Sequence, residues 1–196
     1  MTATLTQTAS APAAVPTSAT AWQIDPAHTQ VEFAVRHLMI STVHGRFSDL
    51  RGALTVSDGD FSHGRLEASI HVGSLDTREP KRDAHLKSAD FFDVDKFPTL
   101  TFMSRRIEAD AKDSAHFTLV GDLTLHGVTR EVTLGVVAEG RGRDPWGNDR
   151  AGFSATGSIS RKDFGLLWNR PVEGGVLVSD DVTITLDVEL VEQEQS

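Results

Sequence analysis

The sequence predicts an all-β fold, and two observations carry this prediction. Apolar and polar side chains alternate with a period of two through most of the chain after Ala21. This spacing places successive side chains on opposite faces of a strand. Short segments rich in turn-forming residues separate these runs, among them 57–60, 109–114, 126–127 and 144–148. Several antiparallel strands joined by short hairpins favour a closed barrel or a sandwich.

We expect about eight strands. The clearest is the last, where Val182, Ile184 and Leu186 alternate with polar residues. The face opposite the apolar one carries Asp, Glu, Thr, Ser, Arg and Lys, which excludes an outer-membrane barrel, whose outer face is apolar. The predicted strands are 29–39, 44–56, 61–73, 99–108, 115–126, 128–141, 150–161 and 180–191.

Two segments interrupt the alternation and predict helical structure. Residues 76–89 predict a short helix that Asp76 or Thr77 caps, with Leu86 on a partial apolar stripe. A second helical turn is predicted after Asp163, over residues 164–168. Helices laid across a barrel mouth act as lids or as walls that face a ligand.

The composition excludes several classes of function. The 196 residues fit a single domain, and 19 Lys and Arg against 28 Asp and Glu give a net charge of −9. This balance argues against nucleic-acid binding, which needs a basic face. The chain has no Cys, which excludes disulfides, thiolate nucleophiles, cysteine-based zinc sites and iron–sulfur clusters.

The first twenty residues differ in composition from the rest. They consist largely of Thr, Ala, Ser and Pro, and the first basic residue of the chain is Arg36. A secretory signal has a positive start and a continuous apolar run, and neither is present. We therefore expect a disordered polar tail over 1–20, a single barrel domain over 21–196 and a cytoplasmic location. No stretch reaches the roughly 18 apolar residues of a transmembrane helix, so we expect a soluble protein.

Small residues on the predicted inward face bear on whether the barrel is hollow. Ala68, Gly121, Ala155 and Gly157 fall on this face, with Gly52 as a further candidate. They either relieve sheet curvature and accept bulky cross-strand neighbours, or they leave a lumen open for an elongated apolar guest. Most of the ten Phe residues also fall where they can line or close such a lumen.

Several motifs resemble the YceI-like family of polyisoprenoid-binding, lipocalin-like proteins. The resemblance covers nearly everything from Ala21 to Leu190, in order. The motifs are IDPAHT at 24–29, VEF at 31–33, RHLM at 36–39, RDAHL at 82–86, DFFDV at 90–94, KFP at 96–98, LTLHGVT at 123–129 and SRKDFGL at 160–166. The resemblance implies an eight-stranded antiparallel lipocalin-like barrel with one or two short helices near its openings, and a hydrophobic tunnel that holds an isoprenoid or a related lipid tail.

We expect this tunnel to bind the apolar tail of an isoprenoid, a quinone or a fatty-acyl lipid, without a cofactor or a metal. The predicted partner is thus a hydrophobic small molecule, and the resemblance leaves a homodimer open. The residues predicted to line the tunnel are Phe33, Phe47, Ala68, Phe91, Phe92, Phe102, Gly121, Phe153, Ala155, Gly157, Phe164 and Trp168.

A second group of residues is predicted to contact the polar head of the ligand. His37 ends an inward-facing alternation, so it bonds a neighbouring group, meets the head group of a lipid or ligates a haem iron. Arg82 and His85 belong to a cationic helix face, which either is solvated or docks a diphosphate or carboxylate. The family resemblance adds Asn169 and Glu173 as head-group contacts.

Motifs for catalysis are sparse. The spacing shows no H-E-x-x-H, no helical His pair, no Asp/Glu/His cluster and no G-x-S-x-G elbow. The predicted function is therefore non-catalytic binding, for storage, transport or sequestration of a lipid. The alternative is an enzyme that acts on a lipid or a quinone, with His37 or Glu173 as general acid–base. A plain interaction domain with a solid core is a third reading.

Overall fold

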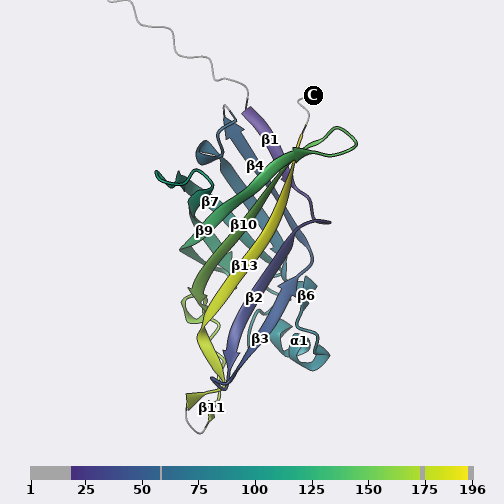
Figure 1. Cartoon of the computed structure of the whole chain (residues 1–196). Coiled ribbons are helices and arrows are strands. Elements are labelled where there is room, and N and C mark those ends of the chain that lie inside the picture. The colour runs from purple at the N-terminus through teal and green to yellow at the C-terminus, as the bar shows by residue number, and fades with distance from the viewer. Residues whose placement is uncertain (1–18, 58, 173–174, 194–196) are drawn as a thin grey trace, which may run out of the picture.

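The computed structural model describes residues 19–57, 59–172 and 175–193. It is built mainly of antiparallel strands (Figure 1), with one α-helix, α1 (Pro80–Lys87), and three 3₁₀ helices, η1 (Phe61–His63), η2 (Val72–Ser74) and η3 (Arg161–Phe164), in this part of the chain. The strands are β1 (Ala19–Ile24), β2 (Gln30–His37), β3 (Ser41–Phe47), β4 (Leu50–Ser57), β5 (Arg65–His71), β6 (Leu75–Asp76), β7 (Thr99–Ala109), β8 (His116–Leu125), β9 (Val128–Arg143), β10 (Asp149–Ser160), β11 (Pro171–Val172), β12 (Gly175–Val176) and β13 (Val178–Glu192).

The sheet closes into a barrel, as the sequence predicts. Strands β1, β4, β5, β7, β8, β9, β10 and β13 follow one another around it, and β1 pairs with β13 to complete the ring. β2, β3 and β6 continue the wall toward the lower end in Figure 1, where β2 takes over from β1 as the neighbour of β13. No helix among the described residues is both long and apolar enough to cross a membrane.

The first barrel strand lies before the region where the sequence predicts strands to begin. β1 places Trp22 and Ile24 in the core, a short alternation that the composition of the tail obscures. Of the predicted tail over 1–20, Ala19 and Thr20 belong to β1, and the rest lies outside the described residues. The prediction of one strand over 44–56 is also wrong, because extended structure is interrupted between the end of β3 at Phe47 and the start of β4 at Leu50. There, the Ser74 hydroxyl accepts hydrogen bonds from the backbone N–H groups of Ser48 and Asp49, each at 3.2 Å.

The helices are shorter than predicted. α1 begins at Pro80 and its cap is Glu79, whose carboxylate accepts from the Lys81 N–H, rather than Asp76 or Thr77. Thr77 instead donates both its N–H and its hydroxyl to Asp83. The turn predicted over 164–168 lies earlier, because Gly165 adopts a positive φ of 77° and ends η3 directly after Phe164.

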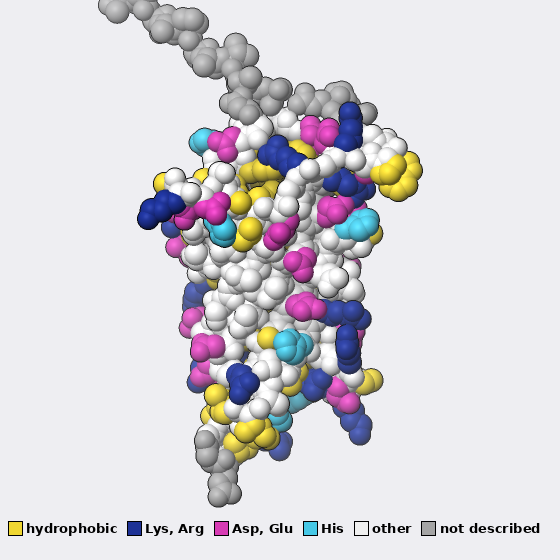
Figure 2. Space-filling model, in the orientation of Figure 1, with side chains coloured by type: hydrophobic (Ala, Val, Ile, Leu, Met, Phe, Trp, Pro, Cys, Tyr) yellow, Lys and Arg dark blue, Asp and Glu magenta, His cyan; other side chains and the backbone are white. Residues whose placement is uncertain are grey.

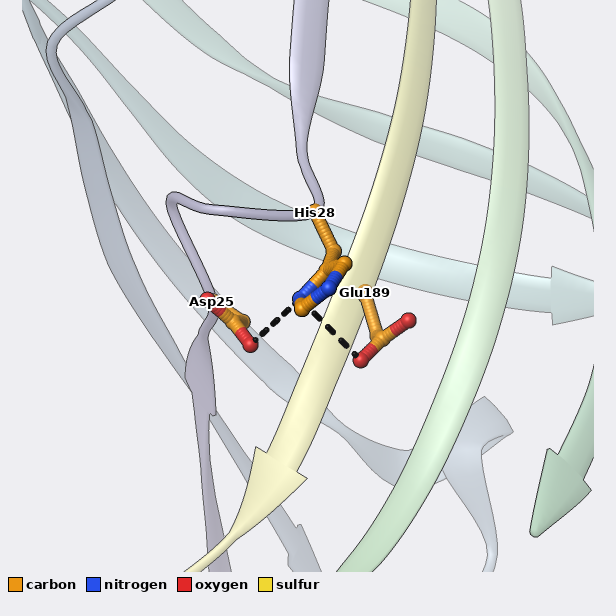
Figure 3. A group of neighbouring side chains, drawn as sticks. All are labelled: Asp25, His28 and Glu189. Carbon is orange, nitrogen blue, oxygen red and sulfur yellow. Dashed lines mark hydrogen bonds and ion pairs between the residues drawn. The ribbon is translucent and has the colours of Figure 1, made fainter. Parts of the chain in front are cut away.

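A polar cluster holds the break between β1 and β2 against β13 (Figure 3). Figure 3 shows His28 between Asp25, to which it bonds at 2.9 Å, and Glu189 on β13, at 3.7 Å. Arg150 donates to Asp25 at 2.8 Å and also bonds to Glu189. The backbone adds two bonds, from Asp25 N–H to Glu189 O and from Glu189 N–H to the Thr29 hydroxyl. The cluster thus keeps β13 paired where its neighbour changes from β2 to β1.

The same contacts change the acidity of Asp25. The hydrogen bonds from His28 and Arg150 lower the pKa of this carboxyl from 3.8 to about 2. They do so because they stabilise its charged form. The stabilisation is therefore complete above the ordinary pKa and is lost as the pH falls from about 4 to about 2.

Arg161 forms a second structural centre, at the start of η3. Its side chain is almost fully buried, and its guanidinium donates to the carbonyls of Ser179, Leu166 and Trp168. It also pairs with Asp180 at 3.0 Å. These bonds fix the segment after η3 against the start of β13.

Asp25→Asn should lower the free energy of unfolding at pH 7 by about 1–2 kcal/mol. The Asn side chain keeps an oxygen for the turn at Ala27 but loses the charge that faces Arg150. Because protonation removes the same charge in the unsubstituted protein, the difference between the two should vanish near pH 2. Urea unfolding at a series of pH values measures this. A difference that stays constant with pH would contradict the role of the Asp25 charge.

Arg161→Met should destabilise the protein by about 3 kcal/mol, because three carbonyls and Asp180 lose a buried cationic donor. Lys162→Met is the matched control, since Lys162 pairs with the same Asp180 carboxylate but is half exposed. It should cost less than about 1 kcal/mol. Equal losses in urea unfolding would show that Arg161 has no special structural role.

Candidate ligand-binding cavity

The interior of the barrel holds a cavity of about 430 Å³. Its lining is almost entirely apolar and comes from every strand of the ring, because the inward positions of the alternating strands carry Val, Leu, Ile and Phe. The cavity runs from Phe61 and Phe153 at the end near β1 to His37 and Trp168 at the end near β11. An elongated apolar volume of this kind suits a long hydrophobic molecule.

Aromatic rings fill the end of the barrel near β1. Phe61 lies between Trp22 and Phe153, with ring centres 5.5 and 5.1 Å away. From outside, the Arg141 guanidinium covers Phe61 at 4.0 Å from the ring centre. This end thus combines a packed aromatic cluster with a single cation above it.

Most residues predicted for the tunnel lie along this cavity. Ala155 on β10 and Ala68 on β5 leave room in the wall, and the aromatic residues surround the rest. The predicted residues that line the cavity are Phe33, Phe47, Ala68, Phe91, Phe92, Phe102, Phe153, Ala155 and Trp168.

Two predicted glycines do not line the cavity. A Cβ at Gly121 would lie 2.4 Å from the ring of Phe102, and a Cβ at Gly157 would lie 2.5 Å from Leu134. The neighbouring side chains, which do line the cavity, cover these positions. Gly52 is likewise covered, by Ile24. These glycines accept bulky neighbours. The prediction that they leave a lumen open for a guest is therefore wrong.

Phe164 is also outside the lining. Its side chain is 1% exposed and packs with Leu123, Leu125 and Leu166 in a separate cluster beneath η3. The ring therefore packs within the protein wall and does not reach the cavity.

Polar lining residues gather at the end of the barrel near α1 and β11. Five of them are Arg36 and His37 from β2, Arg82 and His85 from α1, and Arg161 from η3. The sixth polar lining residue, Glu32, lies farther along β2, opposite Thr185. Figure 2 shows hydrophobic side chains at both ends of the barrel, whereas the wall between them carries charged and other polar groups. We call the end with the polar lining residues the mouth.

His37 differs from the other polar residues of the mouth. Its side chain is partly buried and lines the cavity, yet it makes no hydrogen bond within the described part of the chain. Its backbone carbonyl, by contrast, accepts from Ile40 N–H. The imidazole is therefore free to meet a polar group of a guest.

Arg82 and His85 contribute to the mouth but are partly engaged. Arg82 donates to the hydroxyl and the carbonyl of Thr77, both at 2.8 Å. His85 bonds to Asp90 at 2.9 Å, and its ring packs edge-on against Phe91 and Trp168. These contacts fix α1 across the mouth and turn its inner face toward the cavity.

The two residues that the resemblance adds do not join this group. The Asn169 amide donates to the Val178 carbonyl and accepts from the Val178 and Arg170 N–H groups, so it holds the backbone before β13. It is therefore a structural residue rather than a head-group contact. Glu173 lies outside the described residues.

The structure brings together a cluster of possible metal ligands that the sequence did not predict. Asp25, His28 and Glu189 bring one ligand atom each to within 4.8 Å of one another, although spacing in the sequence shows no such group. Arg150 already bonds to both carboxylates. A cation therefore occupies the space between them, and the arrangement fits an ion-pair latch on the barrel wall rather than a metal site.

Curated relatives cover most of the chain. A UPF0312 protein of Pseudomonas paraeruginosa is 39% identical over 166 residues, which are 85% of this chain and 83% of the relative. A UPF0312 protein of Pectobacterium carotovorum is 42% identical over 139 residues, which are 71% of each chain.

Solved structures share the barrel. The YceI protein of Campylobacter jejuni matches with a TM-score of 0.70 and 30% identity, over 81% of this chain and 90% of that one. A polyisoprenoid-binding domain of Saccharophagus degradans matches with a TM-score of 0.62 and 16% identity, over 88% and 98% of the two chains, which shows a common fold. The model of the YceI-like domain matches residues 22–190, the whole barrel from β1 to β13, and this chain belongs to the YceI-like domain family.

Proposed function

We propose that the barrel binds the apolar tail of an isoprenoid, a quinone or a related amphiphilic lipid, and that it stores, transports or sequesters this molecule. The cavity carries the proposal, because its lining extends through the barrel, is almost entirely apolar and is polar mainly at one end. Its volume of about 430 Å³ lies in the range of small-molecule sites. The domain of S. degradans that shares the fold is described as polyisoprenoid-binding.

The apolar lining supplies enough free energy for binding without chemistry. Burial of one methylene contributes about 0.8 kcal/mol, so ten carbons give about 8 kcal/mol before the costs of binding are subtracted. That corresponds to micromolar affinity. The polar residues of the mouth are then needed to set the orientation of the lipid, rather than to hold it.

Catalysis has less support than binding. His37 is the candidate general acid–base, but within the described residues no side chain orients its ring. A catalytic base is usually held by a third group. The free imidazole suits a hydrogen bond to a head group, which needs no such support.

Native mass spectrometry of the freshly purified protein tests the proposal. We expect a discrete lipid of prenyl, quinone or acyl mass, released by organic extraction. A protein that keeps its apo mass, even after incubation with lipids of all three classes, would refute the proposal.

Ala155→Phe should reduce the retained lipid more than tenfold. Ala155 lies between Leu186 and Val136 in the cavity wall, so a ring there fills the space of the tail. Exclusion of two methylenes already removes about 1.6 kcal/mol. Ala34→Phe, on the outer side of β2 beside Thr183 and His44, is the matched control and should retain lipid. Equal retention by both variants would place the lipid elsewhere.

His37→Leu should weaken binding of a polyprenol about fivefold, through the loss of one hydrogen bond, and leave the corresponding hydrocarbon unaffected. Competition between the two ligands, followed by native mass spectrometry, measures the ratio. His44→Leu, an exposed histidine on the neighbouring strand, serves as control. If His37→Leu weakens the binding of both ligands alike, the imidazole supports the cavity wall and does not bind the head group.

A further inference from the structure

Exposed apolar side chains concentrate at the mouth of the barrel. Seven large apolar side chains are exposed in the described part of the chain, and five of them lie in two segments at this end. Figure 2 shows hydrophobic side chains gathered there, at the lower end. We call these five the apolar rim: Leu38, Met39, Ile40, Leu167 and Val176, which are 38%, 52%, 79%, 65% and 41% exposed.

The two segments of the rim are neighbours. Leu38 N–H donates to the Leu177 carbonyl at 2.9 Å, and Leu177 N–H donates to the Arg170 carbonyl at 3.0 Å. These bonds join the turn between β2 and β3 to the chain on either side of the β11–β12 pair, as their positions in Figure 1 also show. The turn at 38–40 and the residue after Val176 are therefore direct neighbours, and Leu167 lies three residues before Arg170 in the segment bonded to them.

The rim continues the lining of the cavity. His37, Trp168 and Leu177 line the cavity, and each is adjacent in the chain to an exposed member of the rim. Leu38 follows His37, whereas Leu167 precedes Trp168 and Val176 precedes Leu177. An apolar path thus leads from the interior to the surface at three adjacent points. A lipid tail that follows this path meets little polar surface.

The turn that carries most of the rim is held in a strained conformation. Leu38 and Met39 have positive φ values of 50° and 61°, in a region that Gly and Asn normally occupy. Arg36 donates to the Met39 carbonyl at 2.8 Å and to the Thr42 hydroxyl at 3.1 Å, which fixes the turn. Bulky apolar residues at strained positions often serve a function rather than the fold.

Two cations border the rim. Arg36 lies at the base of the turn, and the Arg170 guanidinium lies 5.9 Å from the ring of Trp168. Within the described residues, neither pairs with a carboxylate, unlike Arg161 and Lys162 nearby, which share Asp180. Binding to a bilayer surface grows with the apolar area that is inserted and with the attraction between cations and anionic headgroups, and the rim with its two arginines offers both.

We propose that the apolar rim docks on the surface of an anionic lipid bilayer, so that a lipid passes between bilayer and cavity without crossing water. This proposal rests on the proposed function, because docking can transfer a lipid only if the cavity binds one. Leu38, Met39, Ile40, Leu167 and Val176 insert between the headgroups, while Arg36 and Arg170 pair with their phosphates.

The net charge of −9 does not prevent this docking. β13 alone has 15 residues, about 50 Å of extended strand at roughly 3.3 Å per residue. Charges at the far end thus lie several Debye lengths from the bilayer, since that length is about 8 Å at physiological salt. The bilayer senses mainly the charges near the mouth, where the carboxylate of Asp180 is paired with Arg161 and Lys162.

Sedimentation with vesicles of phosphatidylethanolamine and one quarter phosphatidylglycerol tests the proposal. We expect the protein to pellet with them, and the double variant Ile40→Ser, Leu167→Ser to bind at least tenfold more weakly. Both side chains are largely exposed, so the fold should not change. Trp146→Ser is the matched control, because Trp146 is 82% exposed in the hairpin between β9 and β10, at the opposite end of the barrel.

Three outcomes would overturn the proposal. The first is that the protein is found only in the supernatant. The second is that Trp146→Ser weakens binding as much as the double variant does. The third outcome is concentration-dependent self-association that the double variant abolishes, in analytical ultracentrifugation without vesicles. It would assign the rim to a second copy of this chain.

Native mass spectrometry of the same samples separates this proposal from the proposed function. A double variant that keeps its lipid but no longer pellets supports docking through the rim. If the unsubstituted protein pellets but carries and accepts no lipid, the proposed function fails, and docking as a route for lipid transfer fails with it. If it carries lipid but does not pellet, docking alone fails.

Discussion

Closure of the barrel through β13 is the constraint on which the rest of the structure depends. This strand pairs with β10 on one side and, on the other, first with β2 and then with β1. Without the second set of pairs, the sheet would have two open edges and no enclosed interior. The change of neighbour occurs at the break after Ile24, and there the ion pairs of Asp25, Arg150 and Glu189 replace regular strand pairing. These surface ion pairs thus help to keep the barrel closed around the cavity, although none of the three residues lines it.

The fold was predictable where strands are regular and local in sequence. The hairpins from β7 to β10 follow directly from alternation and turn residues, and the structure confirms them within a few residues. The breaks in the first half of the chain were not predictable. Between β3 and β4, the N–H groups of Ser48 and Asp49 donate to the hydroxyl of Ser74, 26 and 25 residues away, instead of to a neighbouring strand. The end of η3 depends on Gly165, whose positive φ the sequence permits but does not require.

The cavity was predictable in part. Period-two alternation assigns side chains to the inner face, which is why the phenylalanines of the strands lie along the cavity. It does not show how far a neighbouring side chain reaches, so Gly121 and Gly157 could not be distinguished from Ala155, which remains uncovered. Nor does it show hydrogen bonds across the fold: Asn169 is occupied by Val178, and His28 by a carboxylate that the turn at Asp25 supplies.

Most polar groups of the lining lie at one end of an apolar cavity, and this asymmetry has a kinetic consequence for the proposed guests. A lipid whose head remains at the mouth enters tail first and leaves by the same route. Each further methylene in the interior then adds about 0.8 kcal/mol to the barrier for exit, or about a fourfold longer residence time. Five additional carbons lengthen the residence time about a thousandfold on the same basis. Chain length, more than head group, would then determine whether the protein behaves as a rapid shuttle or as a long-term reservoir.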